Sequence, residues 1–155
     1  MDKNLIFKMI MEEMKRNLQV LVDSALEAKE ASTNEESKPE NKYDTRGLEA
    51  SYLASGQAQR AQQLKEKIFY MEQVQLKTFG PKDPVTISAL VELEMDQGLK
   101  KWFFLLPIGG LTVEMNGVSV QSMTQESPIG EALVNSFVDD EIEVNGKYFL
   151  ITQVL

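Results

Sequence analysis

Hydrophobic residues in the first part of the chain recur at alternating steps of four and three. They are Phe7, Met11, Met14, Leu18, Leu21, Ala25 and Ala28. Because residues three and four apart lie on the same side of a helix, this spacing predicts a long helix with one apolar stripe. At about 1.5 Å per residue, a helix of roughly 27 residues reaches about 40 Å.

A second apolar stripe follows the same stepping further along the chain. Its members are Ala50, Ala54, Gln57, Ala61, Leu64, Ile68 and Met71, and they predict a second helix over residues 46–77. The stretch between the helices, about residues 32–45, lacks apolar periodicity and contains Pro39, so it is expected to be a loop. Two such stripes predict an antiparallel coiled-coil hairpin, and their spacing favours mutual packing over a cofactor or lipid surface. Pairing with another chain is the alternative.

The pattern changes at Phe79-Gly-Pro-Lys-Asp-Pro84, where two prolines and a glycine interrupt it. We therefore place a domain boundary here, with the hairpin in residues 1–79 and a second domain in residues 80–155. From Val85 to Met95 apolar residues alternate with smaller or polar ones, which predicts a half-buried strand. The continuous apolar run from Lys101 to Leu106 predicts a central strand covered on both faces.

Turn signals divide the rest of the second domain. Asp96-Gln-Gly98 is expected to turn the chain, and Asn116-Gly117 and Asn145-Gly146 each predict a β-hairpin. Ser127 followed by Pro128 predicts the start of a short helix, because serine caps a helix and proline suits its first position. The second domain is therefore expected to be an α+β unit with an antiparallel sheet and one short helix.

Composition limits what the chain does. Its 155 residues are 43% hydrophobic and 26% charged, the balance of a soluble folded protein. The net charge of −8 opposes binding to phosphate backbones, so a nucleic-acid role is expected only through a protein partner. The chain has no Cys and no His, which removes thiol nucleophiles, disulfides, the usual general base and the commonest zinc ligand.

No self-contained active site is evident. Gly109-Gly110 lacks the lysine and the strand-to-helix setting that a phosphate-binding loop needs. At the amino end, Glu12, Glu13, Lys15 and Arg16 follow too soon for a secretory signal, and no apolar run approaches membrane-spanning length. We expect a cytoplasmic protein that is not itself an enzyme and does not bind a membrane.

Acidic residues gather around the expected loop. They are Glu27, Glu30, Glu35, Glu36, Glu40, Asp44 and Glu49. Carboxylates are hard ligands that suit Mg²⁺, and a metal ion near a phosphodiester polarises it and activates water. Lysines and an arginine are interleaved with these acids, so a solvated loop of mixed charge is the alternative.

Two consecutive motifs in the second domain carry a family resemblance. Ser127-Pro-Ile-Gly-Glu-Ala-Leu133 and Val138-Asp-Asp-Glu-Ile-Glu-Val144 resemble the Ser-Pro-Leu-Gly-Arg-Ala-Leu helix and Val-Gly-Asp-Glu-Val-Glu-Val strand of the bacterial Gre transcript cleavage factors, GreA and GreB. The resemblance covers Val85 to Leu155 and implies an FKBP-like domain. Gre factors also carry an N-terminal coiled-coil hairpin, the layout expected above from periodicity.

The resemblance implies a function. In Gre factors the globular domain grips the rim of the RNA polymerase secondary channel, and the hairpin enters that channel. Acids at its tip help to hold Mg²⁺ in the polymerase active centre, where the polymerase hydrolyses backtracked RNA. By this resemblance Asp44 and Glu49 are the candidate tip carboxylates, and Ser127, Pro128, Ile129 and Gly130 are the candidate partner-binding residues. The factor is expected to be a monomer with no cofactor of its own, sharing Mg²⁺ with the polymerase.

The tip departs from the family pattern. The family's Asp-Leu-Ser-Glu-Asn-Ala-Glu-Tyr is only partly preserved in Tyr43-Asp-Thr-Arg-Gly-Leu-Glu-Ala-Ser-Tyr52. Asp44 and Glu49 are five positions apart, a spacing that does not share a helix face, whereas the family's acids are three apart. In the short helix, Glu131 replaces the usual basic residue. Two alternatives therefore stay open: a channel-binding regulator without cleavage activity, and a structural coiled-coil module that pairs with another protein or with itself.

Overall fold

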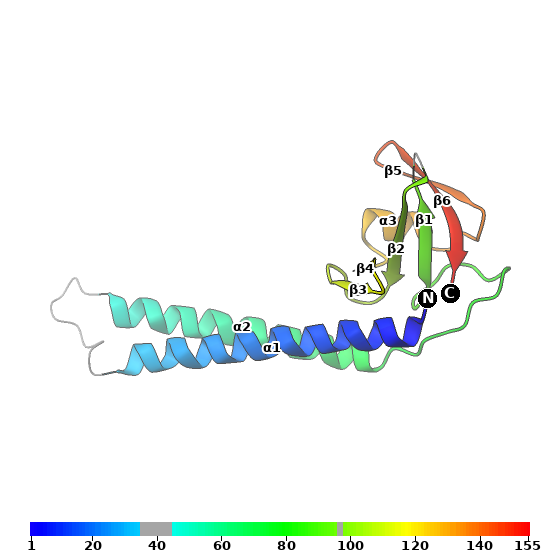
Figure 1. Cartoon of the computed structure of the whole chain (residues 1–155). Coiled ribbons are helices and arrows are strands. Elements are labelled where there is room, and N and C mark those ends of the chain that lie inside the picture. The colour runs from blue at the N-terminus through cyan, green and yellow to red at the C-terminus, as the bar shows by residue number, and fades with distance from the viewer. Residues whose placement is uncertain (35–44, 96–97) are drawn as a thin grey trace. The chain divides into compact units, whose positions relative to one another are not determined.

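The computed structural model of the chain describes residues 1–34, 45–95 and 98–155. Two long helices come first, and six strands with one short helix follow (Figure 1). The fold is therefore α+β, as expected. The described residues group into two compact units, one made of Met1–Met11 with Tyr70–Leu155 and the other of Glu12–Phe69. The first turns of the chain thus belong to the same unit as the sheet.

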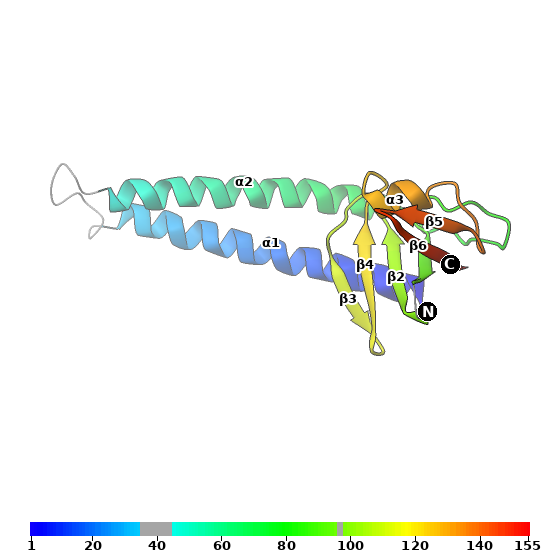
Figure 2. The same cartoon turned by 90° about the horizontal axis from the view of Figure 1, so that it is seen from above.

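The two long helices are α1, Lys3–Thr33, and α2, Arg46–Glu72. They lie side by side and run in opposite directions (Figures 1 and 2). Every member of both expected apolar stripes is buried or half-buried. The prediction that the two apolar stripes pack together in an antiparallel hairpin is therefore confirmed. None of the helices in the described ranges has the length and apolar character needed to cross a membrane.

The helix ends differ from expectation. The second helix stops at Glu72 and does not continue to residue 77. The amides of Gln73 and Val74 instead donate to carbonyls three residues back, and the amide of Lys77 donates to the Ser88 hydroxyl at 2.9 Å. These bonds give the backbone of this segment partners outside the α-helical ladder. Most of the expected loop, residues 35–44, lies outside the described residues.

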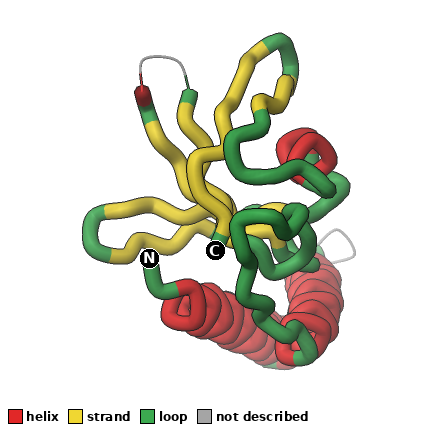
Figure 3. The backbone as a smooth tube through the Cα atoms, turned by 90° about the vertical axis from the view of Figure 1, so that its right-hand side faces the viewer, coloured by secondary structure: helices red, strands yellow, loops and turns green. Residues whose placement is uncertain are grey.

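The six strands form one sheet in the order β3-β4-β2-β1-β6-β5. The strands are β1 Leu90–Glu94, β2 Lys100–Leu105, β3 Thr112–Met115, β4 Val118–Met123, β5 Glu141–Val144 and β6 Lys147–Val154. Figure 3 shows the twisted sheet, in which the grey trace marks residues 96–97 between β1 and β2. The expected turn at Asp96-Gln-Gly98 thus lies largely outside the described residues.

The sheet is mixed, whereas the sequence predicted an antiparallel one. β2 and β4 pair in parallel, with Trp102 opposite Val120, while the other four pairs are antiparallel. The chain reverses once between β2 and β3 and again between β3 and β4. Because β4 lies beside β2 and β3 occupies the edge, β4 runs in the same direction as β2.

The strand expected from Val85 to Met95 is shorter than predicted. Only Leu90–Glu94 is a strand, and the preceding residues form a turn in which the amide of Ala89 donates to the carbonyl of Thr86. Ser88 has a φ of 74°, which an extended strand does not allow. The alternation of apolar residues in the sequence extends through this turn because the apolar side chains of the turn are also buried or half-buried.

Both Asn-Gly hairpins are confirmed. Asn116-Gly117 joins β3 to β4, and Asn145-Gly146 joins β5 to β6. All four turn residues have positive φ, between 52° and 77°. Such values match a type I′ turn, whose twist follows that of the flanking strands.

Both faces of the sheet are covered. On one face, Phe103 and Leu105 belong to a buried cluster that includes Leu133 of the short helix α3, Pro128–Leu133. On the other, the Phe104 ring contacts the Phe7 ring of α1 edge-on, with centroids 6.2 Å apart. The continuous apolar run of β2 is therefore explained by burial on two sides, as expected.

Candidate functional site

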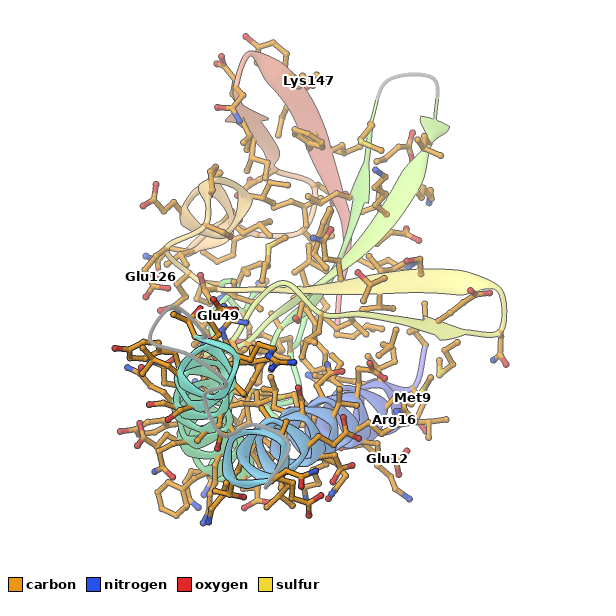
Figure 4. All side chains as sticks on the ribbon, turned by 90° about the vertical axis from the view of Figure 1, so that its left-hand side faces the viewer. Met9, Glu12, Arg16, Glu49, Glu126 and Lys147 are labelled. Atoms are coloured by element: carbon orange, nitrogen blue, oxygen red, sulfur yellow. The ribbon has the colours of Figure 1, made fainter. Side chains whose placement is uncertain are left out.

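One expected tip carboxylate lies in the first turn of α2. Glu49 is exposed, and its backbone amide donates to the carbonyl of Thr45 at 2.9 Å. The Thr45 hydroxyl in turn donates to Glu49 Oε1 at 2.7 Å. A negative side chain is favourable here, because the free amides of a helix N-terminus carry partial positive charge. Figure 4 shows Glu49 at this end of the hairpin.

Asp44, the second expected tip carboxylate, lies outside the described residues. Across residues 1–34, 45–95 and 98–155 there is no group of three or more acidic side chains that could hold a metal ion. A carboxylate such as that of Glu49 suits Mg²⁺, which binds oxygen ligands and commonly takes only one or two carboxylates from protein. Glu49 therefore fits a role as one ligand of an ion held mainly by other groups.

The short helix begins as the sequence predicts. Ser127 is its N-cap, with the hydroxyl accepting from the Gly130 amide at 3.1 Å and donating to the Thr124 carbonyl at 2.7 Å. Pro128 occupies the first turn, where a missing amide hydrogen leaves no bond unmade. This local bonding orders the segment between β4 and β5.

The four candidate partner-binding residues have different environments. Gly130 is buried against Thr124, and a Cβ atom at this position would lie 1.9 Å from the Thr124 carbonyl oxygen. Ile129 packs partly against the core of the sheet, and Ser127 is half-buried as the cap. Pro128 is the exposed member of the four. A partner role for this helix stays a prediction.

A buried polar cluster around Glu92 was not foreseen. A register shift between Glu92 and Leu93 in the β1–β6 pair leaves Thr152 as the extra residue on β6. The Thr152 hydroxyl donates to Glu92 Oε2 at 2.6 Å, and Lys100 Nζ donates to the same oxygen at 2.9 Å. The Glu92 side chain is only 8% exposed, so these bonds compensate for the water it loses.

The surroundings of Glu92 change its acidity. Burial alone would raise the pKa of its carboxyl, but hydrogen bonds from Thr152, Lys100 and Trp102, with the Lys100 charge, hold the pKa below its ordinary value. The same hydrogen bond to Glu92 raises the pKa of Lys100. The bonds from Thr152 and Lys100 to Glu92 Oε2 link β1 to β6 and to β2. Alternation along β1 predicted a polar side chain here but carried no sign of its burial.

The order of helices and strands defines the structural class of the protein. It is an antiparallel helical hairpin followed by a mixed six-stranded sheet with one short capped helix. The chain matches no known family model and no curated protein. It is similar to a crystal structure of GreA factor homolog 1 (Gfh1) of Thermus thermophilus, with 18% identity and a TM-score of 0.39 over 96% of this chain and 92% of that one. A structure described as the transcription factor Gfh1 gives 18% identity and a TM-score of 0.38 over 94% and 92%. Both likenesses are weak, and neither bears on function.

Proposed function

We propose that the chain is a Gre-like transcription elongation factor that acts in the cytoplasm. It binds RNA polymerase through the sheet domain and inserts the helical hairpin into the secondary channel. The observation that carries this proposal is the motif pair from Ser127 to Leu133 and from Val138 to Val144. In the structure the first motif forms the capped helix α3 and the second leads into strand β5.

The hairpin suits such a role in its dimensions. With 31 residues, α1 has a length of about 46 Å at about 1.5 Å per residue. The 27 residues of α2 correspond to about 40 Å by the same rise. Glu49 lies in the first turn of α2, at the end of the hairpin where α1 ends and α2 begins. The hairpin therefore carries a carboxylate at the end that would enter the channel first.

Chemistry at the tip would be shared with the polymerase. Asp44 and Glu49 would contribute carboxylate ligands to a Mg²⁺ ion in the polymerase active centre. Bound there, the ion would polarise the RNA phosphodiester and activate water. This chain contributes position and negative charge, and the polymerase contributes the remaining ligands. The factor is on this proposal an accessory protein and not an enzyme.

Transcript shortening on stalled elongation complexes of the cognate polymerase tests the cleavage role. Asp44→Ala and Glu49→Ala are each expected to reduce shortening by about tenfold or more, as loss of a metal ligand would. The matched control is Glu66→Ala, because Glu66 is also exposed on α2 and accepts a hydrogen bond from the residue four positions back, at 3.0 Å from Gln62. If both tip variants shorten RNA as the wild type does, the cleavage role is rejected.

A channel-binding regulator without cleavage activity is the second candidate. The observations that favour it are the five-residue separation of Asp44 and Glu49 and the hydrogen bond that already engages Glu49 Oε1. Such a regulator would bind core polymerase and compete with a cleavage factor, yet would leave the length of the RNA unchanged. Adding the protein to a reaction driven by a separate Gre factor distinguishes the two candidates.

Binding itself is tested with purified core polymerase at low and high salt. An acidic protein that docks on a basic channel should bind more tightly at low salt. Pro128→Ala removes the ring of the one exposed residue among the four candidates, and Pro107→Ala removes an exposed proline elsewhere in the sheet domain. We expect only Pro128→Ala to weaken binding. Absence of any binding at low salt would reject the proposed function as a whole.

A further inference from the structure

A groove of about 680 Å³ runs between the two helices within the Glu12–Phe69 unit. It lies beside the seam formed by the two apolar stripes. Along α1 its wall includes Leu18, Val22 and Leu26, and consecutive members stand four positions apart. Leu26 is 54% exposed and Val22 is 37% exposed. The hairpin therefore leaves Val22 and Leu26 exposed beside Leu18, which is half-buried in the seam.

The α2 side of the groove includes a row of small side chains. Ala54, Ala58 and Ala61 line it at steps of four and three. Small residues let a neighbouring helix approach closely, and larger residues on the opposite wall then interdigitate with its side chains. Residues 18–29 of α1 extend over about 17 Å at about 1.5 Å per residue, which is about three helical turns. The groove thus has the length and shape for a third helix.

The charged side chains that line the groove indicate which kind of helix it would bind. The charged side chains that line it in the described part of the hairpin are Lys29 and Lys65. Because α1 and α2 are antiparallel, Lys29 lies toward the loop end of the groove and Lys65 toward the other end. A chain with a net charge of −8 therefore carries positive charge at both ends of this surface. Acidic side chains at both ends of a bound helix would complement it.

A second copy of the chain fits the groove less well than a helix with acidic ends. If two hairpins met groove to groove in parallel, Lys29 would face Lys29 of the second copy. If they met in antiparallel fashion, Lys29 would face Lys65 of the second copy. Either arrangement brings like charges together, which disfavours it.

We propose that this groove binds an amphipathic helix of a partner protein, with an apolar face of about three turns and acidic side chains at both ends. The mode of recognition is a helix laid in a hydrophobic groove, anchored by contacts with Leu18, Val22 and Leu26. The residues that line this groove include none of the candidate tip and α3 residues, so the proposal does not depend on the transcription function proposed above.

The test uses the full chain and a fluorescein-labelled synthetic helical peptide of about 18 residues, long enough to be helical. The peptide carries leucines at three- and four-residue steps and glutamates at both ends. A control peptide keeps the leucines and has lysines at the ends. Binding is measured by fluorescence anisotropy, and we expect saturable binding of the acidic peptide with about fivefold weaker binding of the basic one.

Two sets of variants locate the site. Leu26→Gln should weaken binding about tenfold, as loss of an apolar anchor does. Leu53→Gln is the matched control, because Leu53 is also 54% exposed on the hairpin but does not line the groove. The double variant Lys29→Glu, Lys65→Glu should reverse the preference, so that the basic peptide binds more tightly. Circular dichroism checks that each variant keeps its helical content.

Four results would overturn the proposal. One is no saturable binding of the acidic peptide by the folded wild-type chain. The second is an equal effect of Leu26→Gln and Leu53→Gln on binding, and the third is equal affinity of the wild-type chain for the two peptides. The fourth is a concentration-dependent dimer in sedimentation that Leu26→Gln abolishes, which would make a second copy the occupant of the groove.

Discussion

At the scale of single residues, Glu92 shows how a charge is accommodated inside the sheet. Its carboxylate is removed from water but accepts hydrogen bonds from Thr152 and Lys100. These bonds stabilise the charged form, so the folded protein holds the pKa of Glu92 below the ordinary value of 4.5. A carboxyl with a lowered pKa in the folded state stabilises the fold above its unfolded-state pKa. That stabilisation is lost as the pH falls through the folded-state pKa.

Glu92→Gln is therefore expected to lower the free energy of unfolding by about 1–3 kcal/mol at pH 7, the cost of hydrogen bonds to a charged group. The difference from the wild type should shrink as the pH falls below 4.5, where Glu92 of the unfolded chain becomes protonated, and should be lost below the lowered pKa of the folded state. Urea unfolding followed by the fluorescence of Trp102, in the same sheet, measures this across pH. Glu94→Gln is the control, since Glu94 lies 3.8 Å from the same lysine but is 36% exposed. A constant difference at all pH values would contradict the prediction.

Gly130 is constrained by close packing of the backbone. A Cβ atom there would overlap the Thr124 carbonyl oxygen at 1.9 Å, so either the helix or the preceding loop must move. Gly130→Ala should therefore destabilise the sheet domain by about 3 kcal/mol, within the range for overpacking. Gly56→Ala serves as the comparison, because an added Cβ there meets nothing within 4 Å.

Gly56 lies inside α2, where alanine is the better helix former, so Gly56→Ala should stabilise the hairpin by about 0.5–1 kcal/mol. Thermal unfolding followed by circular dichroism compares the two alanine variants. Equal effects of both would show that Gly130 is not packed as described.

At the scale of elements, the hairpin depends on its seam. The exposed fraction of Met14 is 1%, although α1 and α2 are mostly exposed elsewhere. A pair of helices has little other apolar surface to bury, so each seam residue contributes a large part of the stability of the pair. The alanines of the stripes allow close approach but bury less area.

Met14→Ala should cost about 2–5 kcal/mol through the cavity that it leaves. Val20→Ala should change stability by less than about 0.5 kcal/mol, because Val20 is 65% exposed on the same helix. Loss of the helical circular dichroism signal on heating measures the stability of both variants. A similar shift for the two variants would mean that the seam does not hold the hairpin together.

At the scale of the whole molecule, the excess of acidic residues governs association. Twenty-four Asp and Glu residues oppose sixteen Lys and Arg residues. Copies of such a chain repel one another, and the repulsion is strongest at low ionic strength.

The full chain is therefore expected to sediment as a monomer over a series of concentrations at low salt. Raising the salt concentration screens the repulsion, so any self-association should first become detectable at high salt. A dimer at low salt would contradict this expectation and would favour the structural coiled-coil alternative.

The sequence was most informative where structure depends on near neighbours. The stripes from Phe7 and from Ala50, the two Asn-Gly turns and the cap at Ser127 are all present as predicted. Each of these features depends on residues a few positions apart, so the chain itself contains the whole signal.

The errors arose where distant segments meet. The end of α2 at Glu72 follows bonds that reach as far as Ser88, and the short β1 follows the positive φ of that same serine. The parallel β2–β4 pair depends on which strand takes the sheet edge. The burial of β2 on both faces was predicted correctly, but the sequence did not show that α1 covers one face, through contact between Phe7 and Phe104.

The sequence by itself determined the paired helices, the hairpin turns, the capped helix and the absence of His and Cys chemistry. Only the tertiary structure decided the strand order, the buried Glu92 cluster and the groove beside the helical seam. The physical reason is that periodicity specifies which face of an element is apolar but not which partner covers it. That choice depends on contacts between segments that only the folded chain brings together.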